Sequence, residues 1–189
     1  DVTRPVLLYV HGGMPDYFLS KRYPTGFEDL FTVVWWEQRG AGISYDPAIP
    51  RASLTSEQFI ADTLAVTDYL RRRFSQEKIY LMGHSQGGGG ARHLAEKYSD
   101  IWAGVALLAP ALFNVEVTAN SKITKVPLLL AVGDKDSLIT SSRAFSEQLK
   151  GLKVAHEYIE KPGLDHGTII MGAMPEVFAF FPKHVKPAR

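Results

Sequence analysis

The chain has 189 residues and a formal net charge of +1, with 21 Lys and Arg residues against 20 Asp and Glu residues. This near balance gives no reason to expect nucleic acid or an anionic membrane as the main partner. The chain has no cysteine, which excludes disulfides, thiolate catalysis and cysteine-ligated metal. No apolar run approaches the roughly 18 residues of a membrane span, no signal peptide is visible, and the sequence assigns no compartment.

Short apolar runs rich in β-branched and aromatic residues alternate with helical patterns along the chain. Most runs are nearly continuous, as in parallel strands that are buried on both faces. The alternation predicts one α/β domain over residues 1–189, with a mostly parallel sheet of about six strands and helices on both faces. The predicted strands are Val6–Val10, Phe31–Trp36, Ile79–Met82, Gly104–Leu108, Leu128–Val132 and Val154–Ile159. The predicted helices are Thr55–Phe74, Gln86–Tyr98, Ser141–Lys150 and Met174–Lys183.

The loop after the first predicted strand reads VHGGMPD. Gly12 and Gly13 allow the backbone to turn its N–H groups toward one point, and an oxyanion hole needs two such donors. Gly13 is the predicted donor and Met14 the alternative. We expect His11 to support this loop by hydrogen bonding rather than to act in catalysis.

The clearest helix begins at LTSEQF, where Thr55 and Gln58 have the spacing of a capping box. Its predicted buried face is formed by Phe59, Leu64, Val66, Tyr69 and Leu70.

The next strand leads into GHSQG, Gly83–Gly87, which fits the G-x-S-x-G pattern of a nucleophile elbow. In that turn a strand passes sharply into a helix, and the serine lies at the tip with glycines on either side for steric reasons. Ser85 is therefore the predicted nucleophile, and the N–H of Gln86 is the second predicted oxyanion donor. Gly88 to Gly90 are expected to let the helix pack tightly on the sheet. A phosphate-binding loop is excluded because no Lys-Ser or Lys-Thr follows at the required spacing.

A serine hydroxyl becomes a good nucleophile when a base removes its proton and a third group orients that base. In this architecture the acid and then the histidine follow the serine along the chain. Asp134 and Asp136 both follow the predicted strand Leu128–Val132, and Asp136 is preferred because it lies far enough past Gly133 to bend back, whereas Asp134 suits a turn. His166 is the predicted base, since it follows the last strand on a turn-rich loop.

Two other histidines follow the aspartates, but neither occupies the expected loop. His156 falls within the predicted strand Val154–Ile159, and His184 lies in the basic C-terminal tail.

These motifs resemble the α/β-hydrolase superfamily over nearly the whole chain. The first half is similar to the proline-iminopeptidase-like branch in VHGGMPD, in FTVVWWEQRGAGIS and in LTSEQFIADTLAVTDYLRRRF, which leads into IYLMGHSQGG. The second half resembles small esterases and dienelactone-hydrolase-like members, from GHSQGGGGARHLAEKYSDIWAGVALLAPAL to HGTIIMGAMPEVFAFFPKH. The resemblance implies an α/β-hydrolase fold, and it gives Glu37 of EQRGAGIS a mainly structural role.

The chain departs from the iminopeptidase pattern at two places. Gln86 stands where those enzymes carry Trp, and Ala111 to Val126 is too short to hold their helical cap. The expected protein is therefore cap-less, either a natural minimal hydrolase or a trimmed, recombined or designed one.

The first functional hypothesis is a serine esterase that hydrolyses small carboxylic esters through an acyl-enzyme, without metal or cofactor. Ser85 attacks, His166 transfers the proton and Asp136 orients the imidazole. The expected partner is a small-molecule ester, with no nucleic acid and no membrane span, and the oligomeric state is not assigned. Substrate is expected to contact Met14 and Phe113, with Tyr17, Phe18, Leu112 and Leu138 as further candidates.

Two other classes stay open. An aminopeptidase of the iminopeptidase type needs a carboxylate for the substrate amine, and the candidates are Glu37, Asp16 and Glu116. A non-catalytic binding module with the same fold is the third hypothesis, although such proteins usually lose a member of the triad and none is missing here.

Overall fold

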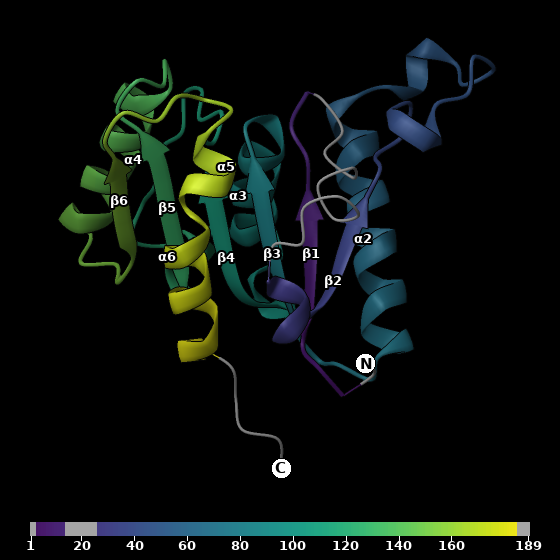
Figure 1. Ribbon diagram of the computed structural model, residues 1–189, viewed down its shortest axis with the longest axis horizontal. Helices are drawn as coiled ribbons and strands as arrows, with labels where there is room; N and C mark the ends of the chain where they lie inside the picture. The colour runs from purple at the N-terminus through teal and green to yellow at the C-terminus, as the bar shows by residue number, and fades with distance from the viewer. Residues whose placement is uncertain (1–2, 14–25, 185–189) are drawn as a thin grey trace.

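The computed structural model describes residues 3–13 and 26–184 of the chain. Within this part, six parallel strands form one sheet in the order β2-β1-β3-β4-β5-β6 (Figure 1). The strands are β1 Val6–Val10, β2 Thr32–Trp36, β3 Ile79–His84, β4 Trp102–Leu108, β5 Leu128–Gly133 and β6 Glu157–Lys161. The predicted parallel sheet is thus confirmed; half of the strand ends lie where they were predicted, and the others are shifted by one to three residues.

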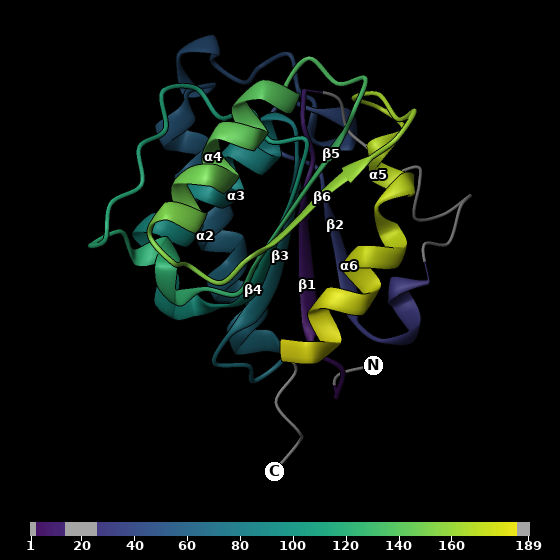
Figure 2. The ribbon, with the colours of Figure 1, turned by 90° about the vertical axis from the view of Figure 1, so that its left-hand side faces the viewer.

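Helices cover both faces of this sheet, as Figure 2 shows in edge view. One face carries α2 Ser56–Arg73, α3 Gln86–Lys97 and α4 Ile139–Gly151, and the other carries α5 Ile169–Gly172 and α6 Met174–Phe180. Short 3-10 helices lie between these elements: η1 Phe27–Asp29, η2 Gly42–Ser44, η3 Arg51–Ser53, η4 Ser99–Ile101, η5 Lys122–Lys125 and η6 Phe181–His184.

The strand order brings two loops together. The chain runs from β1 to β2 on one side of β1 and then returns to β3 on its other side. The connections that leave β1 and β3 therefore diverge, and a crevice forms at the carboxyl ends of these strands. The loop at His11–Gly13 and the turn at Ser85 both lie at this point.

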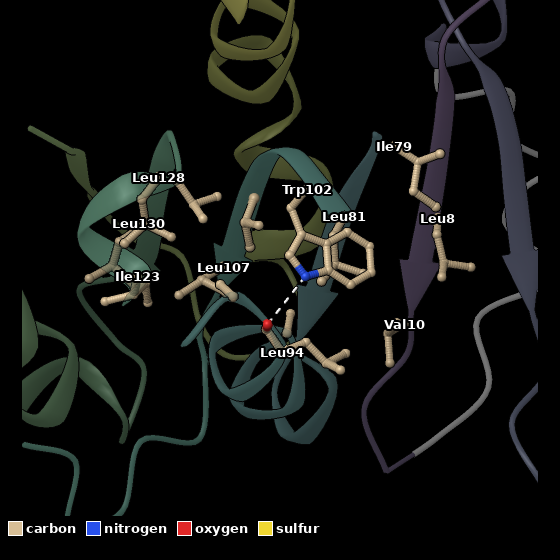
Figure 3. Packing of buried hydrophobic residues seen from close by; sticks show 14 of the residues in the cluster. Leu8, Val10, Ile79, Leu81, Leu94, Trp102, Leu107, Ile123, Leu128 and Leu130 are labelled. Atoms are coloured by element: carbon tan, nitrogen blue, oxygen red, sulfur yellow. Dashed lines mark hydrogen bonds between the residues drawn. The ribbon is translucent and has the colours of Figure 1, made fainter. Parts of the chain in front are cut away.

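Alternate residues of the strands form two separate apolar layers. Leu8, Leu81 and Leu107 are fully buried against the layer of α2, α3 and α4. At the base of that layer, the indole Nε1 of Trp102 donates a hydrogen bond of 3.2 Å to the carbonyl oxygen of Leu94 (Figure 3). The opposite layer packs Leu7, Tyr9, Tyr80, Met82 and Leu129 against Phe27, Phe31, Ile169, Val177, Phe180 and Phe181. Burying the side chains of both layers supplies the main stabilisation of the fold.

Three details of the sequence-based prediction were wrong. Tyr69 is 58% exposed, whereas Thr63 and Thr67 are buried on α2. The last strand begins at Glu157 instead of Val154, because Lys153 adopts a φ of +57° and the N–H of Val154 still bonds to the carbonyl oxygen of Leu149 at the end of α4. The predicted helix Met174–Lys183 ends as an α-helix at Phe180 and continues as η6.

Edge strands also differ from the prediction of strands buried on both faces. β2 and β6 are half-buried along their whole length, whereas β1, β3 and β5 are buried throughout. The last strand carries the charged residues Glu157, Glu160 and Lys161. Charge on an edge strand opposes pairing with another chain.

Candidate active site

The turn between β3 and α3 holds Ser85 in a strained backbone conformation, with φ +55° and ψ −120°. Such a conformation costs on the order of 1–3 kcal/mol for a residue other than glycine. Three hydrogen bonds hold it: the N–H of Ser85 donates to Leu108, and the N–H groups of Gly89 and Ala111 donate to the carbonyl oxygen of Ser85. The serine side chain therefore projects from the tip of the turn, where α3 begins.

The glycines around Ser85 are needed where backbone segments approach closely. A Cβ atom at Gly83 would lie 2.3 Å from the carbonyl oxygen of Gly87, and one at Gly87 would lie 2.1 Å from that of Val10. Gly88 and Gly89 face the loop after β4 at similarly short distances. The expectation of tight packing was wrong for Gly90, where no atom lies within 4 Å of an added Cβ.

We expect Gly83→Ala to lower the free energy of unfolding by about 1–3 kcal/mol, since overpacking against backbone atoms forces the chain to move. Urea denaturation measures this change. Gly151→Ala is the matched control, because Gly151 ends helix α4 with nothing within 4 Å of an added Cβ. Its stability should stay constant or rise by up to about 1 kcal/mol. Equal stability of the two variants would contradict the steric argument.

A chain of hydrogen bonds links Ser85, His166 and Asp136. The Nδ1 atom of His166 lies 2.8 Å from Oδ2 of Asp136, and its Nε2 atom lies 2.9 Å from Oγ of Ser85. Because an ionised carboxylate only accepts hydrogen bonds, Nδ1 carries the proton. The lone pair of Nε2 then faces the serine hydroxyl, which donates to it. This is the arrangement in which an imidazole can take a proton from serine.

Asp136 is fixed in place on the His166 side of the site. Asp136 is 3% exposed, and its Oδ1 atom accepts a hydrogen bond of 2.8 Å from the N–H of Leu138. Asp134 points elsewhere, since its Oδ1 accepts from the N–H of Gly163 at 2.7 Å. Asp134 thereby ties the end of β5 to the loop that carries His166.

Two further contacts hold the His166 loop, and sequence reasoning missed both. Thr168, through its backbone N–H and its hydroxyl, donates hydrogen bonds to the carboxylate of Asp165, and these lower the pKa of that carboxyl group. The Nε2–H of His84 donates to the carbonyl oxygen of His166 at 2.8 Å, and the two rings lie 4.8 Å apart. His84 occupies the unspecified second position of G-x-S-x-G, so the motif carries no signal for this contact.

The two other histidines that follow the aspartates along the chain lie away from this hydrogen-bond chain. His156 precedes β6, and its Nε2 atom accepts a hydrogen bond of 2.9 Å from the fully buried hydroxyl of Ser146. His184 lies in η6 and packs on the ring of Phe180.

The loop after β1 lies directly against the serine turn. A Cβ atom at Gly12 would lie 2.8 Å from Cβ of Ser85, and one at Gly13 would lie 3.7 Å from Oε1 of Gln86. Gln86 is the first residue of α3, where backbone N–H groups lack partners within the helix and favour negative charge. The predicted donors Gly13 and Gln86 thus lie side by side near Ser85, while the alternative donor Met14 lies outside the described residues.

His11 holds this loop through both ring nitrogens. The N–H of Gln38 donates to Nε2 of His11 at 3.1 Å, and Nδ1 of His11 donates to the carbonyl oxygen of Gly12 at 2.8 Å. The side-chain amide of Gln38 also donates to the carbonyl oxygen of His11 at 2.7 Å. These bonds connect the loop after β1 to the start of the loop after β2. The contribution of Gln38 could not be read from the sequence, because Gln38 and His11 meet only when β1 and β2 pair.

A cavity of about 860 Å³ adjoins the Gly13–Gln86 pair. Phe113, a predicted substrate contact, is 74% exposed and lies among the residues that line this cavity. Of the other predicted contacts, Leu112 is buried in the core, and Met14, Tyr17 and Phe18 lie outside the described residues.

Within the described part of the chain, no three His, Asp or Glu side chains gather as metal ligands would. No helix there is long and apolar enough to span a membrane.

The sheet order, with a serine on the strand–helix turn after β3, is typical of the α/β-hydrolase fold. Solved structures of this fold superpose on nearly the whole chain. Est1E from Butyrivibrio proteoclasticus with bound ferulic acid has a TM-score of 0.69 at 19% identity, covering 95% of this chain and 90% of its own. The S-formylglutathione hydrolase FrmB from Staphylococcus aureus has a TM-score of 0.72 at 21% identity, and the match covers 95% of this chain and 82% of the hydrolase. At these identities the likeness shows the fold.

The family is shown by sequence. The family profile described as "Serine aminopeptidase, S33" matches residues 3–123, well over half of the chain. The chain therefore belongs to this family of α/β-hydrolases, as the resemblance of the motifs predicted.

Curated relatives include both peptidases and esterases. A Bacillus subtilis (strain 168) protein described as "Probable aminopeptidase YbaC" is 42% identical over 104 residues, which cover 54% of this chain and 33% of the relative. Cutinase 2 of Thermobifida cellulosilytica is 31% identical over 100 residues, which cover 51% of this chain and 36% of the cutinase. The chain thus spans about a third of the length of the curated relatives it matches.

Proposed function

We propose that this protein is a serine esterase that hydrolyses small carboxylic esters through an acyl-enzyme intermediate. The observation that carries the proposal is the hydrogen-bond chain from Ser85 through His166 to Asp136, with distances of 2.9 and 2.8 Å. Nucleophile, base and orienting acid are recognised by this geometry rather than by their positions in a sequence.

The proposed reaction begins when Oγ of Ser85 attacks the ester carbonyl carbon and its proton passes to Nε2 of His166. The carbonyl oxygen becomes an oxyanion that the N–H groups of Gly13 and Gln86 stabilise, each worth about 2.7–4 kcal/mol in comparable enzymes. The tetrahedral intermediate then expels the alkoxide, which takes the proton from His166. Water, deprotonated by the same imidazole, attacks the acyl-enzyme, and the collapse of the second intermediate returns the proton to Ser85.

Aminopeptidase activity is the second candidate, favoured by the family description and by the similarity to YbaC. One of the carboxylates named for the substrate amine, Glu37, offers it little. Glu37 is 6% exposed, and its Oε2 atom accepts a hydrogen bond from the N–H of Ile43. Glu116 lies exposed in the segment between β4 and β5, and Asp16 lies outside the described residues. This segment, residues 109–127, contains the 3-10 helix η5 and no α-helix, which supports a site without a helical cap between β4 and β5.

The test compares hydrolysis of p-nitrophenyl acetate with that of proline p-nitroanilide by the same preparation. We expect the ester to be cleaved and the amide to be cleaved at least 100-fold more slowly in kcat/KM, because amide hydrolysis also requires recognition of the amine. A fluorophosphonate probe should label Ser85, and mass spectrometry of the peptide identifies the residue. Preference for the anilide would support the aminopeptidase, and an unreactive Ser85 in folded protein would support a binding module.

A further inference from the structure

The cavity beside the Gly13–Gln86 pair extends away from Ser85 between helices α2 and α3. Its lining follows α3 from Gln86 to Leu94, which spans about 12 Å at the rise of an α-helix. One end therefore lies at the proposed oxyanion donors, and the rest passes between the two helices. Its apolar lining includes Val10, Phe59, Ile60, Leu64, Leu94 and Phe113.

The position of His166 determines which half of an ester would enter this cavity. As general acid, His166 must lie beside the leaving oxygen when the alcohol departs. Among the described residues, neither His166 nor Asp136 lines the cavity, whereas Gly12, Gly13 and Gln86 do. With the carbonyl oxygen directed at Gly13 and Gln86 and the leaving group directed at His166, the acyl group extends toward the cavity.

Two charged side chains of the cavity wall are Arg39, which is paired with Asp62, and Glu57, which is exposed to solvent. The guanidinium of Arg39 donates two hydrogen bonds to the carboxylate of Asp62, at 2.7 and 2.8 Å. Burial, together with the nearby Arg92 and Lys97, lowers the pKa of His93, which favours its neutral form. A neutral apolar chain can occupy this space without leaving a buried charge unpaired.

Gly90 explains why the cavity remains open along α3. Glycine within a helix is destabilising by up to about 1 kcal/mol relative to alanine, and at Gly83 and Gly87 close backbone contacts require it. At Gly90 nothing lies within 4 Å of an added Cβ, and the residue lines the cavity. Packing therefore does not require this glycine, whereas a longer side chain there would extend into the cavity.

We propose that the cavity between α2 and α3 binds the acyl chain of the substrate and that Gly90 sets the chain length it admits. The volume, about 860 Å³, lies in the range of roughly 300–1,000 Å³ typical of sites for organic ligands. The substrate class is an ester of a medium-chain aliphatic acid, such as an octanoate. This inference rests on the proposed esterase function and specifies its acyl site.

The experiment measures kcat/KM for p-nitrophenyl acetate and p-nitrophenyl octanoate in the wild-type protein and in Gly90→Leu. We expect the wild-type protein to prefer the octanoate, because one buried methylene is worth about tenfold or more in such a pocket. Gly90→Leu should lose at least about tenfold on the octanoate and less than twofold on the acetate. Gly151→Leu, at another glycine with open space around its Cβ position, should leave both rates unchanged.

Octyl acetate distinguishes the acyl site from an alcohol site. Its long chain belongs to the leaving alcohol and not to the acyl group. Gly90→Leu should therefore change its rate of hydrolysis less than twofold. Equal losses on acetate and octanoate, or a selective loss on octyl acetate, would overturn the assignment of the cavity to the acyl group. If the wild-type protein cleaves no ester, the esterase proposal fails; if it cleaves acetate but Gly90→Leu alters no chain-length preference, only the acyl-site inference fails. Gly90→Ala, with a side chain of one methyl group, should lose less on the octanoate than Gly90→Leu does, because it fills less of the cavity.

Discussion

Replacing Ser85 with alanine is expected to lower kcat for p-nitrophenyl acetate by a factor of about 10⁵ or more. In serine hydrolases generally, loss of the nucleophile costs about as much as loss of the whole triad, and only a weak residual catalysis from binding and the oxyanion donors persists. The variant keeps the Cβ atom and the three backbone hydrogen bonds of the turn. Its free energy of unfolding should therefore stay close to that of the wild-type protein.

Ser146 provides a matched control for this variant. Its hydroxyl bonds to Nε2 of His156 at 2.9 Å, the same distance as in the Ser85–His166 pair, but it is fully buried on α4. Ser146→Ala should retain activity while it loses about 1 kcal/mol of stability, the usual worth of a buried hydrogen bond. A Ser85→Ala variant that remains within tenfold of the wild-type rate would refute the assignment of the nucleophile.

Replacing Asp136 with asparagine is expected to lower kcat by about 10⁴, the size of effect known for this substitution in a serine protease triad. The carboxylate accepts the proton of Nδ1 in His166, and an amide can donate instead. The imidazole would then carry its proton on Nε2, facing Ser85, and could no longer act as a base. Ester hydrolysis by purified, folded variant measures the loss, with circular dichroism as the check on folding.

Asp134→Asn serves as the comparison, since both changes remove one charge from the same loop. Asp134 bonds to the N–H of Gly163, and an asparagine oxygen can still accept that bond. We expect its kcat to remain within about tenfold of the wild-type value, because an indirect effect on the His166 loop should be small. A larger loss in Asp134→Asn than in Asp136→Asn would reverse the assignment of the acid.

Sequence periodicity predicted the elements whose pattern is local. The buried runs at Val6–Val10 and Leu128–Val132 became β1 and β5 almost without change, because a continuous apolar run suits a strand with helices on both faces. Helix α2 begins where the Thr55 signal places it, and the Thr55 hydroxyl accepts from the N–H of Gln58. The start of β6 was missed because Val154 retains a backbone bond to α4, which competes with strand pairing.

Motif order narrowed the candidate site to a few residues, and the structure brings three of them into hydrogen-bond contact. Ser85 and His166 are separated by 81 positions along the chain, and Asp136 and His166 by 30. The choice between Asp134 and Asp136 required the fold, since both follow the same strand and only their turn geometry differs. The roles of these residues in catalysis stay predictions that the variants above test.

By itself the sequence determined the α/β class, the position of the serine turn and the order of the groups around it. These properties follow from short-range patterns: apolar periodicity, glycine spacing and the demands of a tight turn on its own neighbours. Only the tertiary structure decided that His84 holds the loop of His166, that Gln38 locks His11, and that Gly90 faces a cavity while Gly83 faces backbone. The physical reason is that glycines in one motif look alike as letters, whereas their environments depend on which distant segments the parallel sheet and its helices bring beside them.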